Sequence, residues 1–247
     1  MKIKWIIFIL LCLFFSGLVN VNAESPEEIL FKSDIVRSPQ YDYSVKTRII
    51  NKKPGKEDKI ALYEVLLKGR DNTIIKTLAP EVDRGTNLLM LKYDLWVFMK
   101  TISKPLRISL QQRLFGEAAN GDIARANFSG DYTPKLMGVE DLNGHLCHVL
   151  ELFAKDERVT YHKVTLWVKK ENYHPIKAEF FAFSGKLLKV CFYTEFKDML
   201  GVVRPTRMIL IDPLVKGKQT IIDYTNMREE NFPDKIFTKH YLKKLKY

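Results

Sequence analysis

The chain has 247 residues, which is enough for one sizeable domain or two small ones. Lysine and arginine outnumber aspartate and glutamate by 40 to 29, so the formal net charge is +11 at pH 7. Such a charge suits an anionic lipid surface, an acidic partner or a nucleic acid, and a basic surface without any partner is the alternative. After the first 23 residues, no segment is apolar enough to span a bilayer.

The first 23 residues have the pattern of a cleaved secretory signal peptide. Lys2 and Lys4 form a basic start, residues 6–19 form a short apolar run, and Ala23 ends a cleavage motif. The alternative is an uncleaved anchor, but the run is shorter than the roughly 20 residues of a membrane-spanning helix. The sequence therefore predicts an exported protein of residues 24–247 with a formal charge of +9, for which no nucleic-acid partner is expected.

A helix comes first after the predicted cleavage site. Residues 25–37 begin with a capping serine and a proline in the first turn, and Glu28 completes a capping box. Residues 232–244 predict a short terminal helix whose basic end suits the helix dipole.

Strands fill most of the chain between these two helices. Alternating apolar and polar residues predict strands at 41–50, 60–69, 73–80, two within 87–99, 106–110, two around Asn143-Gly144, three within 161–196, 202–212 and 218–227. These strands have hairpin-length connections and no crossover helices, which excludes a parallel α/β sheet. The sequence predicts a single, mainly β domain with a few helices, built on a strongly curved, barrel-like antiparallel meander.

Many of these strands carry large aromatic residues. Successive side chains point to opposite faces of a strand, so Phe180 must face away from Phe181 and Phe183. A fully exposed aromatic face would favour aggregation, so both faces are expected to be covered. The pattern suits a curved sheet that encloses something apolar, or an ordinary core beneath the two predicted helices.

Two cysteines follow the predicted cleavage site. Export permits a disulfide between Cys147 and Cys191. Two predicted strands separate the strands that carry them, and such strands are not neighbours in a meander. Two small buried residues are the simpler interpretation, and the pairing stays open.

Motifs for catalysis and metal binding are missing from the sequence. It contains no nucleophile elbow, no H-E-x-x-H or C-x-x-C pair and no Walker A loop. The best cluster is His145, Cys147 and His148, but on a strand His148 faces away from the other two. We therefore expect no enzyme activity, no cofactor and no metal site.

The stretch from Arg113 to Pro134 interrupts the strand pattern. It contains three glycines and no lysine, so it is not a P-loop, and no base accompanies Ser129. Asp122 could cap a short helical turn, and Phe115, Ile123 and Phe128 could hold the segment against an apolar surface. A movable lid and a static surface loop are the two interpretations.

Several segments, taken in order, resemble a known family. They are NGDIARANFSGDYTPKLMG, GHLCHVLELFAK, YHKVTLWVKKENYHPIKAEFFAFSGKLLK, RPTRMILID and FPDKIFTKHYL. In this order and spacing they resemble the LolA-like outer-membrane lipoprotein-sorting proteins of bacteria, from about Ile35 to the C-terminus.

The resemblance implies an incomplete barrel closed by helices over an apolar cavity. It also implies a non-enzymatic periplasmic carrier, which binds lipoprotein acyl chains or another lipid for outer-membrane sorting and possibly meets an inner-membrane export complex. The aromatic residues expected to line the cavity are Trp96, Phe98, Phe115, Phe128, Trp167 and Phe181. The alternative is a non-enzymatic adaptor subunit of a membrane lipid-export complex, with side chains filling the cavity.

Overall fold

The computed structural model describes residues 24–125 and 127–245. The predicted signal peptide lies outside the described residues, and none of the described helices is long and apolar enough to cross a membrane. The helices are α1 (Pro26–Arg37), α2 (Asn120–Ala124), α3 (Phe128–Asp131) and α4 (Lys239–Leu242), and the 3-10 turns are η1 (Glu81–Asp83) and η2 (Asp234–Ile236). The strands are β1 (Tyr43–Lys52), β2 (Lys59–Lys68), β3 (Asn72–Ala79), β4 (Asn87–Leu91), β5 (Asp94–Phe98), β6 (Leu106–Ile108), β7 (Arg113–Phe115), β8 (Ala118–Ala119), β9 (Tyr132–Leu142), β10 (His145–Ala154), β11 (Lys163–Lys169), β12 (Pro175–Phe181), β13 (Leu187–Met199), β14 (Val202–Ile211) and β15 (Gln219–Glu229).

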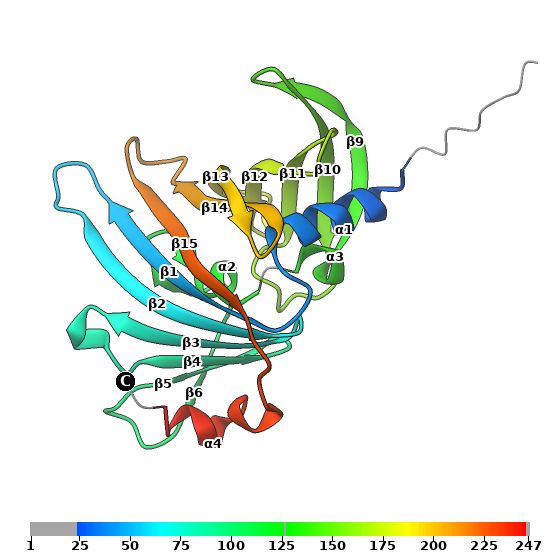
Figure 1. The fold of residues 1–247 in the computed structure, drawn as a ribbon. Coiled ribbons are helices and arrows are strands. Elements are labelled where there is room, and N and C mark those ends of the chain that lie inside the picture. Colours follow the sequence, from blue (N-terminus) through cyan, green and yellow to red (C-terminus); the bar gives the residue numbers. More distant parts are fainter. Residues whose placement is uncertain (1–23, 126, 246–247) are drawn as a thin grey trace, which may run out of the picture.

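One large antiparallel sheet forms the body of the molecule. Its strand order is β6-β5-β4-β3-β2-β1-β15-β14-β13-β12-β11-β10-β9, so the chain runs as two meanders that are joined where β1 pairs with β15. The sheet curves strongly around α2, and β6 and β9 are its two ends (Figure 1). This confirms the expected curved, antiparallel, incomplete barrel, which is not closed.

The concave face of the sheet holds the main core. Alternate residues of the central strands point into it, as Val45 and Ile49 do on β1, and these two are nearly fully buried. α1, α2 and α3 contribute Ile29, Ile123 and Phe128 to the same cluster. The predicted serine cap of α1 is confirmed, because the Ser25 side chain accepts a hydrogen bond from the Glu28 amide, whereas the Glu28 carboxylate pairs with Lys32.

The convex face carries two smaller apolar clusters. η2 and α4 cover the outward side chains of β2, β3 and β4, where Ile74 and Leu89 are fully buried. The second cluster joins Cys147, Val149 and Trp167 on β10 and β11. Both faces of the sheet are therefore covered in part, as the aromatic pattern suggested.

The C-terminal segment is more broken than the single predicted helix. η2 ends at Ile236, and α4 starts only at Lys239, because Thr238 between them has an extended backbone. The Thr238 side chain accepts a hydrogen bond from the Tyr241 amide and so caps α4. The segment makes two short turns that fit the curved convex surface.

Both described cysteines are free thiols and do not pair. Cys147 belongs to a convex-face cluster, whereas Cys191 lies in the main core on the concave face. Burial raises the pKa of Cys191 to about 12, so its thiol stays protonated and unreactive near neutral pH.

Candidate ligand-binding interior

The segment of residues 109–125 and 127–131, which we call the strap, connects the two ends of the sheet. It leaves β6 at one end and enters β9 at the other, so it must cross the concave face (Figure 1). Leu110, Ile123, Ala124 and Phe128 of the strap are buried in the main core. The strap therefore packs as part of the interior.

A buried ion pair holds the strap to the middle of the sheet. Lys189 on β13 places its Nζ atom 2.5 Å from Asp122 of α2, and both side chains are less than a tenth exposed. Lys189 also donates to the Glu117 carbonyl, and Asp122 accepts hydrogen bonds from the Tyr161 hydroxyl and the Ala119 amide. All of these groups belong to one connected polar network beneath the helices.

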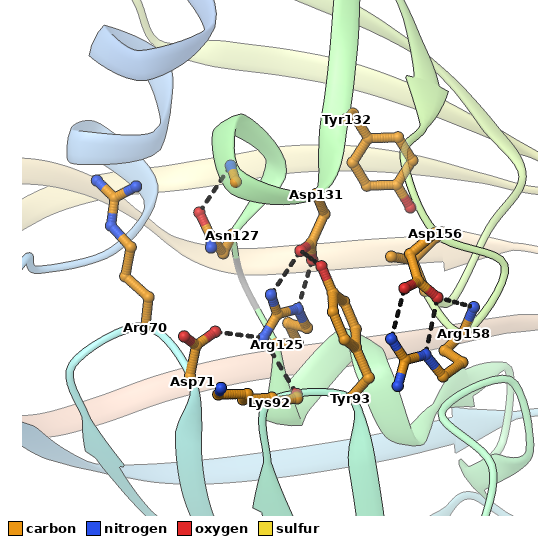
Figure 2. A network of polar contacts seen from close by, with 12 residues as sticks. Arg70, Asp71, Lys92, Tyr93, Arg125, Asn127, Asp131, Tyr132, Asp156 and Arg158 are labelled. Atoms are coloured by element: carbon orange, nitrogen blue, oxygen red, sulfur yellow. Dashed lines mark hydrogen bonds and ion pairs between the residues drawn. The ribbon is translucent and has the colours of Figure 1, made fainter.

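A second buried ion pair fixes the strap near its C-terminal end. Arg125 donates from two guanidinium nitrogens to the Asp131 carboxylate, and both side chains are at most 5% exposed (Figure 2). A third nitrogen reaches Asp71 and the Lys92 carbonyl in the two turns that flank β3 and β4. The Tyr93 hydroxyl donates to Asp131 at 3.1 Å. The hydrogen bonds of Arg125 and Asp131 therefore join the strap to the first meander (Figure 2).

The third anchor joins α1 to the strap. Asp34 and Arg37 form a buried pair at 2.6 Å, and Asp34 also accepts a hydrogen bond from the Ser129 amide. The Arg37 guanidinium lies 3.7 Å from the centroid of the Phe128 ring. Burial raises the pKa of Asp34, although Arg37 and the Ser129 amide lower it.

Close packing explains the glycine in the middle of the strap. A Cβ atom on Gly121 would lie 1.8 Å from the Thr160 hydroxyl oxygen, and the Gly121 amide donates to the Leu110 carbonyl at 3.0 Å. Glycine is needed here for a close approach. The backbone at Gly121 is therefore tightly held. For the strap to move as a lid, the three anchors would also have to release.

The space enclosed between the helices and the sheet is small. A cavity of about 60 Å³ has room for a few water molecules but not for an acyl chain. Its walls are formed by Arg37, Tyr43, Val45, Val65, Leu67, Asp122, Ile123, Tyr193, Arg204, Pro205, Met208, Tyr224 and Met227. The walls are mostly apolar, and the flexible side chains of Met208 and Met227 could adapt to a ligand.

The six aromatic residues predicted from the sequence are not brought together. Phe128 is buried in the main core and Phe115 packs against it, both from the strap. The other four lie on the convex side: Trp96 beneath Lys239 of α4, Phe98 beside the cluster that α4 covers, Trp167 in the Cys147 cluster, and Phe181 beneath Lys163. Their pairing partners on neighbouring strands place them there, and these four do not line the enclosed cavity.

The charged groups of the interior were not predicted as a set. The sequence offered one local signal, Asp122 as the cap of a helical turn that follows it. This placement was wrong, because α2 already begins at Asn120, and Asp122 accepts a hydrogen bond from the amide of the N-cap residue Ala119. Its partner Lys189 is 67 residues away, and nothing in the local pattern of β13 marks it. Within the described part of the chain, no group of three or more histidine, cysteine, aspartate or glutamate side chains could hold a metal ion.

Comparison with known proteins agrees with this architecture. A family model for uncharacterized proteins matches residues 69–244. A LolA superfamily protein from Nitrosomonas europaea is 46% identical, with a TM-score of 0.85, over 89% of this chain and 100% of that chain. No curated protein matches the chain.

Two more distant solved structures show the same fold. A DUF1329 family protein from Desulfovibrio piger is 23% identical, with a TM-score of 0.77, over 88% of this chain and 97% of that chain. A putative outer membrane lipoprotein-sorting protein domain from Vibrio parahaemolyticus is 24% identical, with a TM-score of 0.75, over 88% of this chain and 98% of that chain. The chain belongs to the LolA superfamily, as its sequence resemblance indicated.

Proposed function

We propose that this protein is a periplasmic carrier that binds the acyl chains of a lipoprotein or another lipid for sorting to the outer membrane. In this proposal residues 1–23 are a signal peptide and residues 24–247 form one lipid-binding domain. Each CH₂ group that moves from water into an apolar interior contributes about 0.8 kcal/mol, so acyl chains need such a shelter to cross water. The carrier would be non-enzymatic, since no bond is made or broken.

The observation that carries the proposal is the apolar concave interior, which the strap and α1 cover. The strap and α1 close this interior through buried ion pairs and not through a continuous backbone ladder. A cavity of about 60 Å³ must widen before it accepts an acyl chain, and the adaptable Met208 and Met227 side chains lie in its wall. Binding therefore requires the covering elements or the strands around the cavity to shift.

Filling the cavity should weaken lipid binding. We expect Met208→Trp to lower the affinity for a dansyl-labelled fatty acid about tenfold, which corresponds to about 1.4 kcal/mol. Ile209→Trp is the matched control, because Ile209 is the next residue on β14 and does not line the cavity. Fluorescence titration checks both variants. Equal affinities in the two variants would contradict binding in the cavity, and a wild-type protein without affinity for the probe would contradict the carrier itself.

A second candidate is a non-enzymatic adaptor subunit of a membrane lipid-export complex. The small volume of the enclosed cavity favours it, since side chains would then fill the interior permanently. The chain also ends in an exposed basic region. Lys235, Lys239, Lys243 and Lys244 are all exposed there, and no acidic residue follows Asp234 in the sequence.

The adaptor candidate predicts salt-dependent membrane attachment through this region. Replacing Lys239, Lys243 and Lys244 with glutamine should weaken co-sedimentation with anionic vesicles about a hundredfold, because each lysine contributes about 1 kcal/mol near such a surface. The control triple changes Lys53, Lys56 and Lys59, which are exposed at the turn between β1 and β2. Attachment that is equal in both triples, or that is unaffected by high salt, would count against this candidate.

A further inference from the structure

The large sheet forks between β14 and β15. These strands pair only from Ile211 opposite Gln219 to Arg207 opposite Asp223. Beyond this point β14 continues beside β13 as far as Val202, whereas β15 continues beside β1 as far as Glu229. Residues 202–206 and 224–229 therefore have no ladder between them, and we call this gap the fork.

The backbone on both sides of the fork is built to diverge. Glu195, on the strand that pairs with β14, and Asn226, on β15, both have positive φ, of 54° and 51°. The ladder between β1 and β15 shifts register at the same height, between Ser44 and Lys46, so β15 carries an extra residue there. Bulges and left-handed residues bend strands, which makes the fork a fixed feature of the fold.

Different parts of the molecule hold the two arms of the fork. Arg204 on β14 is buried and donates to the Val36 carbonyl at the end of α1, so this arm is tied to α1. The other arm, β15, is held by its ladder to β1. An ion pair between Arg207 and Asp223, with 2.6 Å between Nε and Oδ1, closes the last paired position. Widening the fork requires only that the two arms separate beyond this pair.

The fork separates an outer groove from the enclosed cavity. A groove of about 610 Å³ runs over it, and Glu195, Thr206, Arg207 and Asn226 are among its walls. The cavity of about 60 Å³ borders the same strands from Arg204, Pro205 and Met208. Tyr224 lines both spaces, so its side chain is part of the partition between them.

We propose that the fork is a lateral portal, through which an acyl chain slides from the outer groove past Tyr224 into the interior. This inference rests on the proposed carrier function and names its route of entry. The groove is about tenfold larger than the cavity and can receive a chain before the interior widens. The polar end of the lipid stays outside, where the charged rim of the groove keeps it in water. Entry through the fork does not require the strap to release its buried ion pairs.

The test is to block the groove without touching the core. Thr225 is exposed on β15 and lines the groove. Thr225→Trp should therefore slow the association of a dansyl-labelled fatty acid about tenfold, as measured by stopped-flow fluorescence. This rate change corresponds to an activation barrier that is about 1.4 kcal/mol higher. Thr133→Trp on β9 is the matched control, because Thr133 is an exposed strand threonine that lies far along the strand order from β15. Tyr224→Leu, which shortens the partition, should speed association.

The association rates of these variants test the portal and the carrier function separately. Slower loading in Thr225→Trp alone, with the free energy of unfolding unchanged, supports the portal. Equal rates in Thr225→Trp, Thr133→Trp and the wild type overturn it and leave entry beneath the strap, while the carrier function stands. A wild type that takes up no fatty acid at all overturns the carrier function, and the portal with it.

Discussion

Lys189→Met is expected to lower the free energy of unfolding by about 3–5 kcal/mol. The substitution keeps the apolar stem but leaves the Asp122 carboxylate buried without its cation, with only the Tyr161 hydroxyl and the Ala119 amide as donors. Removing one partner of a buried pair costs far more than the pair contributes, because the remaining charge stays desolvated. Urea denaturation of the two proteins measures the difference.

Two further variants sharpen this test. Adding Asp122→Asn to Lys189→Met removes the stranded charge, so the double variant should be more stable than the sum of the single losses predicts. Lys163→Met is the control, since Lys163 pairs with Glu151 at 2.9 Å but both side chains are about a quarter exposed. We expect Lys163→Met to change the free energy of unfolding only slightly. Similar losses in Lys189→Met and Lys163→Met would contradict a special role for the buried pair.

Arg125→Leu is the second substitution with a large expected effect, again about 3–5 kcal/mol in the free energy of unfolding. The Asp131 carboxylate is 4% exposed and would keep only the Tyr93 hydroxyl among the side chains that bond to it. The strap would also lose its link to Asp71 and the Lys92 carbonyl. Hydrogen exchange should report faster opening of α2 and α3 than of the central strands.

Arg158 provides a control on the same aromatic ring. The Arg125 and Arg158 guanidinium carbons lie 4.5 and 4.8 Å from the centroid of the Tyr93 ring. Arg158 is half exposed and its ion pair is with Asp156, two residues away, so that ion pair does not join distant segments (Figure 2). Arg158→Leu should leave the stability nearly unchanged. Protection of the strap that is the same in both variants would refute the anchoring role of Arg125.

The strands were predictable because their signals are local. Alternation of apolar and polar side chains reveals a half-buried strand, and the Asn143-Gly144 pair marks a tight hairpin. In the structure both residues have positive φ, of 55° and 81°, as such a turn requires. The start of α1 was equally local, since a capping serine acts within one turn.

Which face a residue occupies could not be predicted, because it depends on pairing between distant strands. Phe180 and Phe181 are both large and apolar, yet Phe180 enters the main core and Phe181 lies outside under Lys163. Trp96 looked like a cavity residue, but α4 from the far end of the chain covers the convex face beside it. The buried ion pairs could not be predicted for the same reason, since Asp122 contacts Lys189 only because the strap crosses the sheet.

The pairing of β1 with β15 sets the order in which the molecule can be completed. Ile49 on β1 lies opposite Ile222 on β15. The two meanders can therefore become one sheet only after β15, the last strand, pairs with β1. Until then β1 and β14 are both bare edges, open to pairing with another chain. Contacts this distant in sequence slow folding, so the single sheet should form only when nearly all of the chain is present. In the proposed export the chain would gain from this delay, because it would be threaded through a membrane before it folds.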